Sequence, residues 1–173
     1  SANVRWLQAA QIKEGPRKGS WTYGNSNINA GDNSNTQFAV LALHEAERAG
    51  AKVDDVTWRL SLAYWQSAQN QDFSWGYQMV GPRSVSPGTG SMTCAGLTSL
   101  IISSGRTSAG DAKIVGGEVQ CCGEQDSNKP VEGAINWLGR HFTVQTNPST
   151  MANAGREWLF YYCLLYTSPS PRD

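Results

Sequence analysis

The sequence predicts an all-α fold made of stacked helix pairs, and three observations lead to this prediction. A phrase that starts with an aromatic residue and ends with glutamine occurs twice, at Trp6–Gln11 and at Tyr64–Gln69. Each copy is followed by a loop rich in glycine, serine and asparagine that contains a further tryptophan. Between these loops, apolar residues recur at helical spacing. Such repetition is typical of folds in which each small unit buries its apolar face against the next unit, as in a solenoid or a closed ring of helix pairs.

The first three expected helices are bounded by clear start and stop signals. The first ends before Gly15, which breaks the helix together with the proline that follows it. The second starts at an N-cap cluster that begins with Ser34, and it stops at Gly50. Asp54 and Asp55 open the third helix, where their charges meet the positive end of the helix dipole. These three helices are expected to cover residues 3–12, 34–49 and 54–67.

The last three expected helices have similar signals. Ser91 opens a capping cluster for the fourth helix, which ends at Gly105. Residues 106–127 form a polar insertion. Pro130 suits the first turn of the fifth helix. No strand-like alternation is strong enough to challenge the all-α prediction. These helices are expected to cover residues 91–105, 130–142 and a stretch that starts near residue 156.

Charge and hydropathy exclude several classes of protein. The chain has 173 residues with 14 basic and 14 acidic side chains, so its formal charge is zero. A neutral chain lacks the basic surface that binds nucleic-acid phosphates or anionic lipids. No apolar run is long enough to span a bilayer, and no leader peptide is visible at Ser1. We therefore expect no nucleic-acid partner and no transmembrane segment.

The last eleven residues have no relation to the rest of the chain. Residues 163–173 resemble, letter for letter, the translation of a common sequencing adapter. We interpret them as a non-native tail, a cloning or assembly scar, and exclude them from the fold prediction. Residues 1–162 are then expected to be a fragment of a larger domain.

The repeated phrase resembles the QW motif of squalene and oxidosqualene cyclases, whose ring of helix pairs also carries the β-subunits of protein prenyltransferases. The third copy is partial, because Trp137 starts it but Phe142 stands where the glutamine belongs. The resemblance covers about residues 3–162 and implies an α/α toroid, here an incomplete ring. In the two fuller copies the matching residues are Trp6, Leu7, Gln11, Gly19 and Trp21, and Tyr64, Gln69, Phe73 (in the glycine position) and Trp75.

The resemblance implies a structural role for the repeated glutamines and tryptophans. In such rings the glutamine side chain bonds backbone groups at a helix end, and the tryptophan stacks over it. We therefore interpret Gln11, Trp21, Gln69 and Trp75 as groups that tie each loop to the next helix.

The resemblance also predicts where a catalytic acid would lie. Cyclases protonate an alkene or epoxide with an acid from a D-x-D-D-T-A motif at the start of an inner helix, and an alkene needs an unusually strong acid. The corresponding segment keeps Asp32 and Thr36, but Ser34 and Asn35 replace the two inner carboxylates. Neither replacement can donate such a proton. We expect these residues to cap the helix and predict no catalytic residue in this repeat.

Other candidate chemistry is weaker. Adjacent acids such as Asp54 and Asp55 point to different faces of a helix and do not converge on one metal. No spacing supports a zinc set, so no metal and no cofactor are expected. Cys122 and Gln125 lie in a Cys-Gly-Glu-Gln stretch that resembles the internal thioester of complement and α2-macroglobulin proteins, which are also helix-pair rings.

Several aromatic residues are candidates to line a central apolar cavity. Tyr23, Tyr77 and Trp158, with the motif tryptophans, could supply the cation–π contacts that cyclases use. We favour a non-catalytic repeat module of a larger, bacterial-type protein that binds a hydrophobic (isoprenoid) ligand or a protein partner. The first alternative is part of an isoprenoid cyclase or prenyltransferase whose catalytic acids lie outside the chain. The second alternative is a thioester-containing domain.

Overall fold

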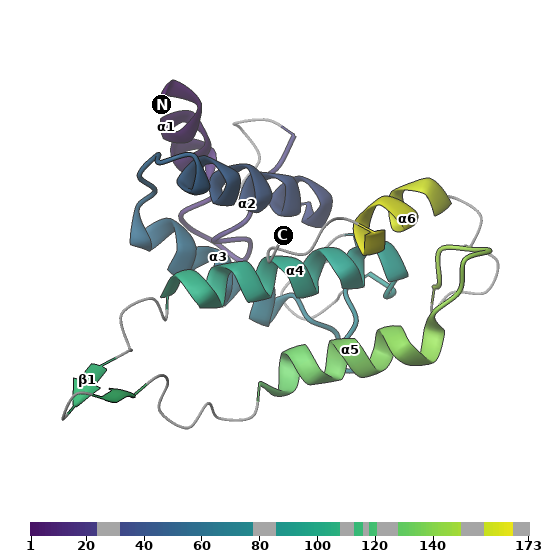
Figure 1. Ribbon diagram of the computed structural model, residues 1–173. Coiled ribbons are helices and arrows are strands. Elements are labelled where there is room, and N and C mark those ends of the chain that lie inside the picture. The colour runs from purple at the N-terminus through teal and green to yellow at the C-terminus, as the bar shows by residue number, and fades with distance from the viewer. Residues whose placement is uncertain are drawn as a thin grey trace.

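The computed structural model describes residues 1–23, 32–77, 86–107, 113–115, 118–120, 128–149 and 158–167. In these ranges the chain forms six helices and one short antiparallel hairpin (Figure 1). The helices are α1 (Ala2–Ala10), α2 (Asn33–Arg48), α3 (Asp55–Ser67), α4 (Gly90–Thr107), α5 (Lys129–His141) and α6 (Leu159–Thr167). The hairpin consists of β1 (Lys113–Val115) and β2 (Glu118–Gln120). The all-α prediction is thus confirmed, and the closure of the helices into a toroid stays a proposal.

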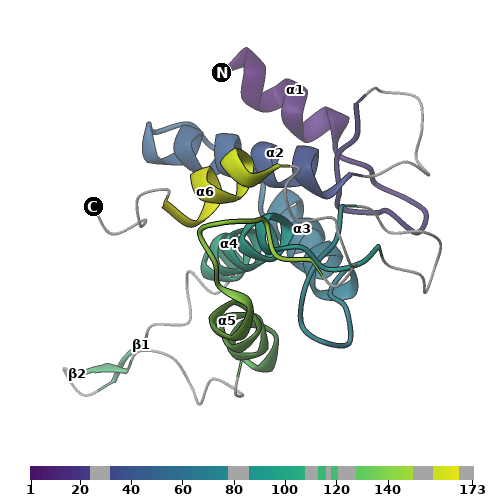
Figure 2. The same cartoon turned by 90° about the vertical axis from the view of Figure 1, so that its right-hand side faces the viewer.

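Helix α4 lies at the centre of the molecule and packs against α2, α3, α5 and α6 (Figures 1 and 2). Its sequence suits this place, because it is rich in small residues that let neighbouring helices approach closely. A side chain at Gly96, for example, would overlap the indole ring of Trp75. Helix α1 lies at the edge of the molecule away from α5 (Figure 2).

Two apolar clusters form the core. The first joins α1, α2 and α3 with one residue of α4, and Leu43 and Trp58 are at its centre. The second joins α3, α4 and α5 around Trp65, Trp75 and Met92. Each cluster therefore lies between one helix pair and the first helix of the next pair. We call α1 with α2 the first pair, α3 with α4 the second pair, and α5 with α6 the third pair.

The helix ends differ from the predictions in several places. Helix α2 starts one residue earlier than expected, because Asp32 is its cap. Asp54 precedes α3, but its side chain makes no capping hydrogen bond. Helix α4 runs past Gly105 to Thr107, whose hydroxyl donates to a carbonyl of the preceding turn. Helix α5 ends at His141, one residue before Phe142.

The insertion and the C-terminal region hold the two larger differences. The predicted polar insertion contains the hairpin, which the sequence analysis did not anticipate. Helix α6 starts at Leu159 and continues to Thr167, so it includes the first five residues of the stretch interpreted as a non-native tail. Tyr162, just before that stretch, is fully buried.

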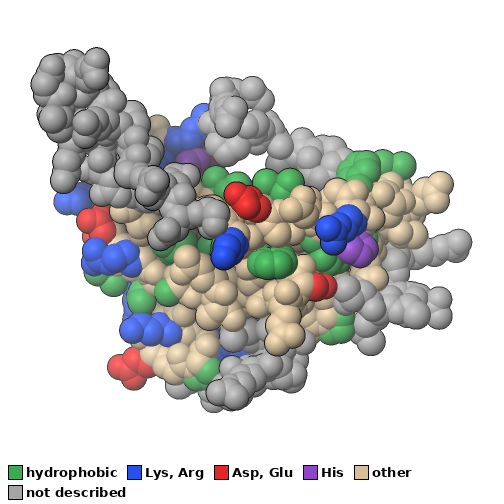
Figure 3. Space-filling view, turned by 90° about the horizontal axis from the view of Figure 1, so that it is seen from below, with side chains coloured by type: hydrophobic (Ala, Val, Ile, Leu, Met, Phe, Trp, Pro, Cys, Tyr) green, Lys and Arg blue, Asp and Glu red, His purple; other side chains and the backbone are tan. Residues whose placement is uncertain are grey.

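Among the described residues, no helix is both long enough and apolar enough to cross a membrane. On the face shown in Figure 3, basic and acidic side chains are interspersed among polar and hydrophobic ones.

Candidate functional site

Gln11 joins the first pair to the second. It lies directly after α1, and its amide Nε2 donates to two backbone oxygens, those of Gly19 and Thr57, at 3.1 Å each. Gly19 belongs to the loop after α1, and Thr57 belongs to the first turn of α3. The Gln11 side chain is buried, and Lys13 Nζ donates to its Oε1 at 2.7 Å. One side chain therefore holds a helix end, its loop and the next helix together.

Gln69 makes the same two bonds in the second pair. Its Nε2 donates to the carbonyl of Phe73 at 3.1 Å and to the carbonyl of Pro130 at 2.9 Å. Phe73 occupies the loop position of Gly19, and Pro130 lies in the first turn of α5. The connection between the second and third pairs thus repeats the connection between the first and second.

The motif tryptophans bind the loop to both helices of their own pair. Trp21 Nε1 donates to the carbonyl of Leu7 at 2.8 Å, and its backbone N–H donates to Thr36 Oγ1 at 3.0 Å. The hydroxyl of Thr36 in turn donates to the carbonyl of Asp32 at 2.7 Å. Buried donors and acceptors are satisfied in this way without any ligand.

Trp75 repeats this set of bonds. Its Nε1 donates to the carbonyl of Trp65 at 3.0 Å, and its backbone N–H donates to Thr93 Oγ1 at 3.3 Å. The hydroxyl of Thr93 donates to the carbonyl of Thr89 at 2.7 Å. Both tryptophans are buried. The two pairs are therefore equivalent atom by atom at these positions.

The degenerate acid position is a helix cap. Asp32 is largely buried, and its Oδ1 accepts hydrogen bonds from Asn35 N–H at 2.9 Å and from the hydroxyl of Ser34. These bonds satisfy the carboxylate as an acceptor at the start of α2. Thr36 is fully buried and serves the network described above. This segment holds no acid that is exposed to a substrate.

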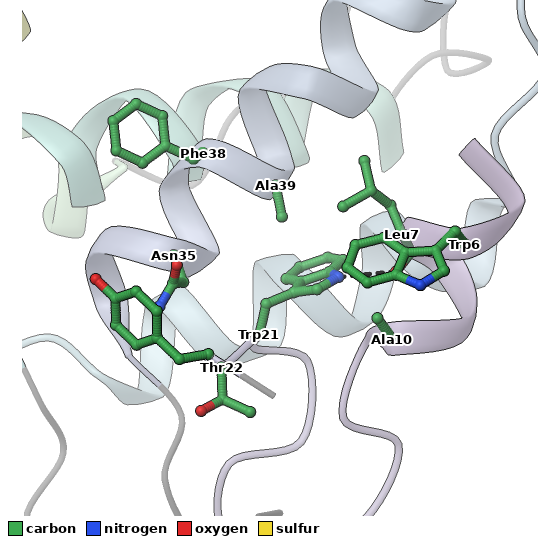
Figure 4. Close-up of a pocket in the computed structure, with 9 residues that line it drawn as sticks. Trp6, Leu7, Ala10, Trp21, Thr22, Asn35, Phe38 and Ala39 are labelled. Atoms are coloured by element: carbon green, nitrogen blue, oxygen red, sulfur yellow. Dashed lines mark hydrogen bonds between the residues drawn. The ribbon is translucent and has the colours of Figure 1, made fainter. Parts of the chain in front are cut away.

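The described residues contain an open groove of about 370 Å³ between α1, the loop after it and the start of α2 (Figure 4). Pockets that bind small ligands commonly have volumes of about 300 Å³ or more, so this groove is large enough to hold a small ligand or a few side chains of a partner. Its walls are mostly apolar. The residues that line it are Trp6, Leu7, Ala10, Trp21, Thr22, Tyr23, Asn35, Phe38 and Ala39.

The groove combines exposed aromatic rings with a shielded polar group, the amide of Asn35. Trp6 is 59% exposed and Phe38 is 51% exposed, although both belong to packed helices. The Nδ2 atom of Asn35 is shielded from solvent and has no hydrogen-bond partner within the described part of the chain. A buried amide without a partner is costly, so a partner that supplies an acceptor here gains affinity.

The other predicted aromatic residues do not all gather at this groove. Tyr23 lines it, whereas Tyr77 and Trp158 contact each other with ring centroids 6.3 Å apart. Burial and the nearby Asp32 raise the pKa of Tyr77. Trp137, from the partial third copy, is buried, and its Nε1 donates to Asp72 Oδ2 at 3.1 Å.

The remaining candidates concern cysteines and metals. Cys94 is buried, and burial raises the pKa of its thiol to about 12. In the described ranges, no three His, Cys, Asp or Glu side chains converge as a metal site would require. Cys122 and Gln125 lie outside the described residues.

Sequence reasoning missed Phe38 as a site residue. Phe38 was counted among the apolar positions of its helix, where burial is the usual expectation. The available signal was its counterpart in the second pair, Ala95, because a large exposed ring stands where the repeat has a small buried residue.

No protein-family model, curated protein or solved structure matches this chain.

Proposed function

We propose that this chain is a non-catalytic helix-pair repeat module of the squalene-cyclase and prenyltransferase type, an incomplete α/α toroid that binds a hydrophobic ligand or a protein partner. The repeated hydrogen-bond network supports the repeat type. Gln11 and Gln69 each bond a loop and the next helix, as the resemblance implies for the glutamine of a QW motif. We propose the same structural role for all four motif side chains, which include Trp21 and Trp75.

The non-catalytic assignment rests on the residues at the start of α2, where a cyclase would have its catalytic acid. Alkene protonation needs a strong carboxylic acid whose proton is free to move to the substrate. Asp32 instead accepts two hydrogen bonds at the start of α2, and Ser34 and Asn35 are not acids. The same position in the second pair, where the chain reads Thr89–Thr93, carries no carboxylate at all. Neither inner helix start can therefore begin a cyclisation.

The groove supports the binding part of the proposal. Exposed rings in a hollow lose ordered water when a partner covers them, which favours association. The unpartnered Asn35 amide adds a polar contact that fixes the orientation of the partner.

Two assays test this function together. The first measures turnover of squalene, of oxidosqualene and of farnesyl diphosphate with a peptide acceptor, and we expect none. Turnover that is lost in the Asp32→Asn variant would contradict the proposal, because it would make Asp32 an acid catalyst. The second assay follows the fluorescence of an anilinonaphthalene sulfonate dye, which reports exposed apolar surface.

The dye assay has a matched control. Phe38→Glu places a charge in the groove, and we expect it to lower the dye signal. Ile135→Glu changes an equally exposed apolar residue on α5, which is 54% exposed, and we expect little effect on groove binding. Equal signals from the wild-type chain and both variants would show that the groove binds nothing apolar.

A further inference from the structure

The residues that line the groove in the first pair can be compared with the residues at the equivalent positions of the second pair. The bonds of Gln11 and Gln69 align α1 with α3, and the bonds of Thr36 and Thr93 align α2 with α4. This alignment pairs every groove residue with one residue of the second pair. Among the pairs are Trp6 with Tyr64, Tyr23 with Tyr77, Asn35 with Met92, and Phe38 with Ala95.

The counterparts of the exposed groove residues are buried or, for Tyr77, partly buried. Tyr64 is 1% exposed, whereas Trp6 is 59% exposed. Met92 and Ala95 are both fully buried, whereas Phe38 is half exposed. The same surface of the repeat unit is therefore covered in the second pair and open in the first.

The first pair covers Tyr64 and the loop of the second pair, whereas Met92 and Ala95 are buried in the apolar cluster that joins α3, α4 and α5. The Tyr64 hydroxyl donates to Asn33 Oδ1 of α2. The Asn33 side chain donates to the carbonyl of Gly76 at 2.6 Å, and its backbone N–H donates to the carbonyl of Tyr77 at 3.0 Å. Gly19, in the loop of the first pair, lies against Leu60 and Tyr64, where it leaves no room for a side chain.

The covering pair also precedes the covered pair in the chain. A short connection, residues 49–54, leads from α2 to α3, and Asp54 N–H donates to Gln8 Oε1 at 2.6 Å across it. The second pair is similarly followed by the third, where Gly90 N–H donates to the carbonyl of Pro148 at 2.7 Å in the manner of Asn33 and Tyr77. Each interface is thus formed by one pair and the pair that follows it.

We propose that the groove is the docking face for a further helix pair of the same repeat, joined ahead of α1 in the same polypeptide. This inference rests on the proposed function, because it names the partner of that binding surface. An asparagine or glutamine side chain from the added pair lies over the Trp6 edge, as Asn33 lies over Tyr64. Its apolar residues fill the groove beside Phe38, which also contacts the Tyr161 ring of α6, and one of its acceptors receives the Asn35 amide.

The experiment extends the full chain by one repeat. Residues 1–58 are duplicated ahead of Ser1, so that Ser1 follows the duplicated Trp58 and the alignment of α1 with α3 is kept. The reporter is Trp6→Cys in the original copy, and the control is Ile135→Cys on α5. The rate of alkylation by iodoacetamide at each position is measured by peptide-resolved mass spectrometry, and the buried Cys94 is a slow internal reference.

We expect the extension to slow alkylation of the Trp6→Cys thiol by about tenfold or more, because exposure limits thiol reaction, and to leave the Ile135→Cys thiol unchanged. Adding Phe38→Glu to the extended chain should restore fast alkylation. Equal alkylation rates with and without the extension would overturn the proposal. The same holds if the rates are equal because the added segment stays unfolded. Alkylation of the Trp6→Cys thiol could also slow in the unextended chain as the protein concentration rises. That result would assign the groove to a second copy of the chain and would overturn the proposal.

The two proposals can fail separately. Turnover in the enzyme assays would contradict the proposal of a non-catalytic module. It would not change what the alkylation rates say about the docking of a helix pair. Unchanged alkylation without turnover would keep the binding module and remove only the helix pair as its partner.

Discussion

Gly19 and Phe73 occupy the same place in the repeat, and both have a left-handed backbone, with φ of 97° and 68°. This conformation costs a residue with a side chain about 1–2 kcal/mol, and glycine avoids the cost. At position 19 a side chain has no room, because the backbone carbonyl of Leu60 in the next helix lies against it. At position 73 the ring has room, because the counterpart of Leu60 on α5 is Gly133. The Phe73 ring therefore occupies the space that a side chain at position 133 would need.

The contact between Phe73 and Gly133 predicts a compensating pair of substitutions. Gly133→Leu should destabilise the fold by about 1–3 kcal/mol, because the new side chain overlaps the Phe73 ring. Adding Phe73→Gly should recover about 1 kcal/mol or more, since it removes both the overlap and the strained backbone. Urea denaturation of the wild type, the two single variants and the double variant measures this coupling. Strictly additive effects would show that the two residues do not share a contact.

At the scale of elements, the ends of α2 and α4 are joined by a charged network. Arg106 donates to His44 Nδ1 at 3.1 Å and forms an ion pair with Glu47 at 3.0 Å. Trp58 Nε1 donates to the same carboxylate at 3.3 Å, which brings α3 into the network. Because a guanidinium has no acceptor, this contact requires His44 Nδ1 to be unprotonated.

The network predicts a pH dependence of stability. Burial is the main cause that lowers the pKa of His44, and the Arg106 and Arg48 charges lower it further, against the opposing effect of Glu45 and Glu47. A folded pKa below the unfolded value of about 6.5 means that the unfolded chain binds more protons in this range. The contribution of neutral His44 to the free energy of unfolding is therefore fully present above pH about 6.5. It is lost as the pH falls through the pKa that His44 has in the folded protein.

Thermal unfolding between pH about 7 and about 5 measures this dependence. The wild type should lose stability over this range, and the His44→Gln variant should lose less, because glutamine keeps an acceptor for Arg106 without titrating. The same slope in both proteins would assign the pH dependence to other groups.

The helices were predictable because their signals are local. Apolar spacing and the Gly50 breaker identified α2 within one residue of each end, and Pro130 placed the start of α5. The extension of α4 to Thr107 was missed because Gly105 predicts its end locally, while packing on α2 and α3 sustains the helix. The candidate site also has features that depend on local sequence and features that depend on packing. The cap at Asp32 was readable from its neighbours, whereas the exposure of Phe38 depends on which helices lie beside it.

At the scale of the whole molecule, one rule describes both interfaces between pairs. One pair supplies N–H donors from the glutamine after its first helix and from the start of its second helix, and the next pair supplies carbonyl acceptors. Stability in such arrays comes mainly from contacts between neighbours. Among the described residues, no helix pair covers the face of α1 and its loop that matches the covered face of the second pair, which explains why the groove and its exposed rings lie there.

The most direct test of this account is hydrogen exchange at the indole N–H groups, which nuclear magnetic resonance resolves for each tryptophan. Assignment uses single Trp→Phe variants. We predict slow exchange for Trp21 and Trp75, which are buried and bonded to equivalent carbonyls, and fast exchange for Trp6 at the open groove. Exchange of Trp21 and Trp75 as fast as that of Trp6 would contradict the repeated network, and with it the repeat module on which both proposals depend.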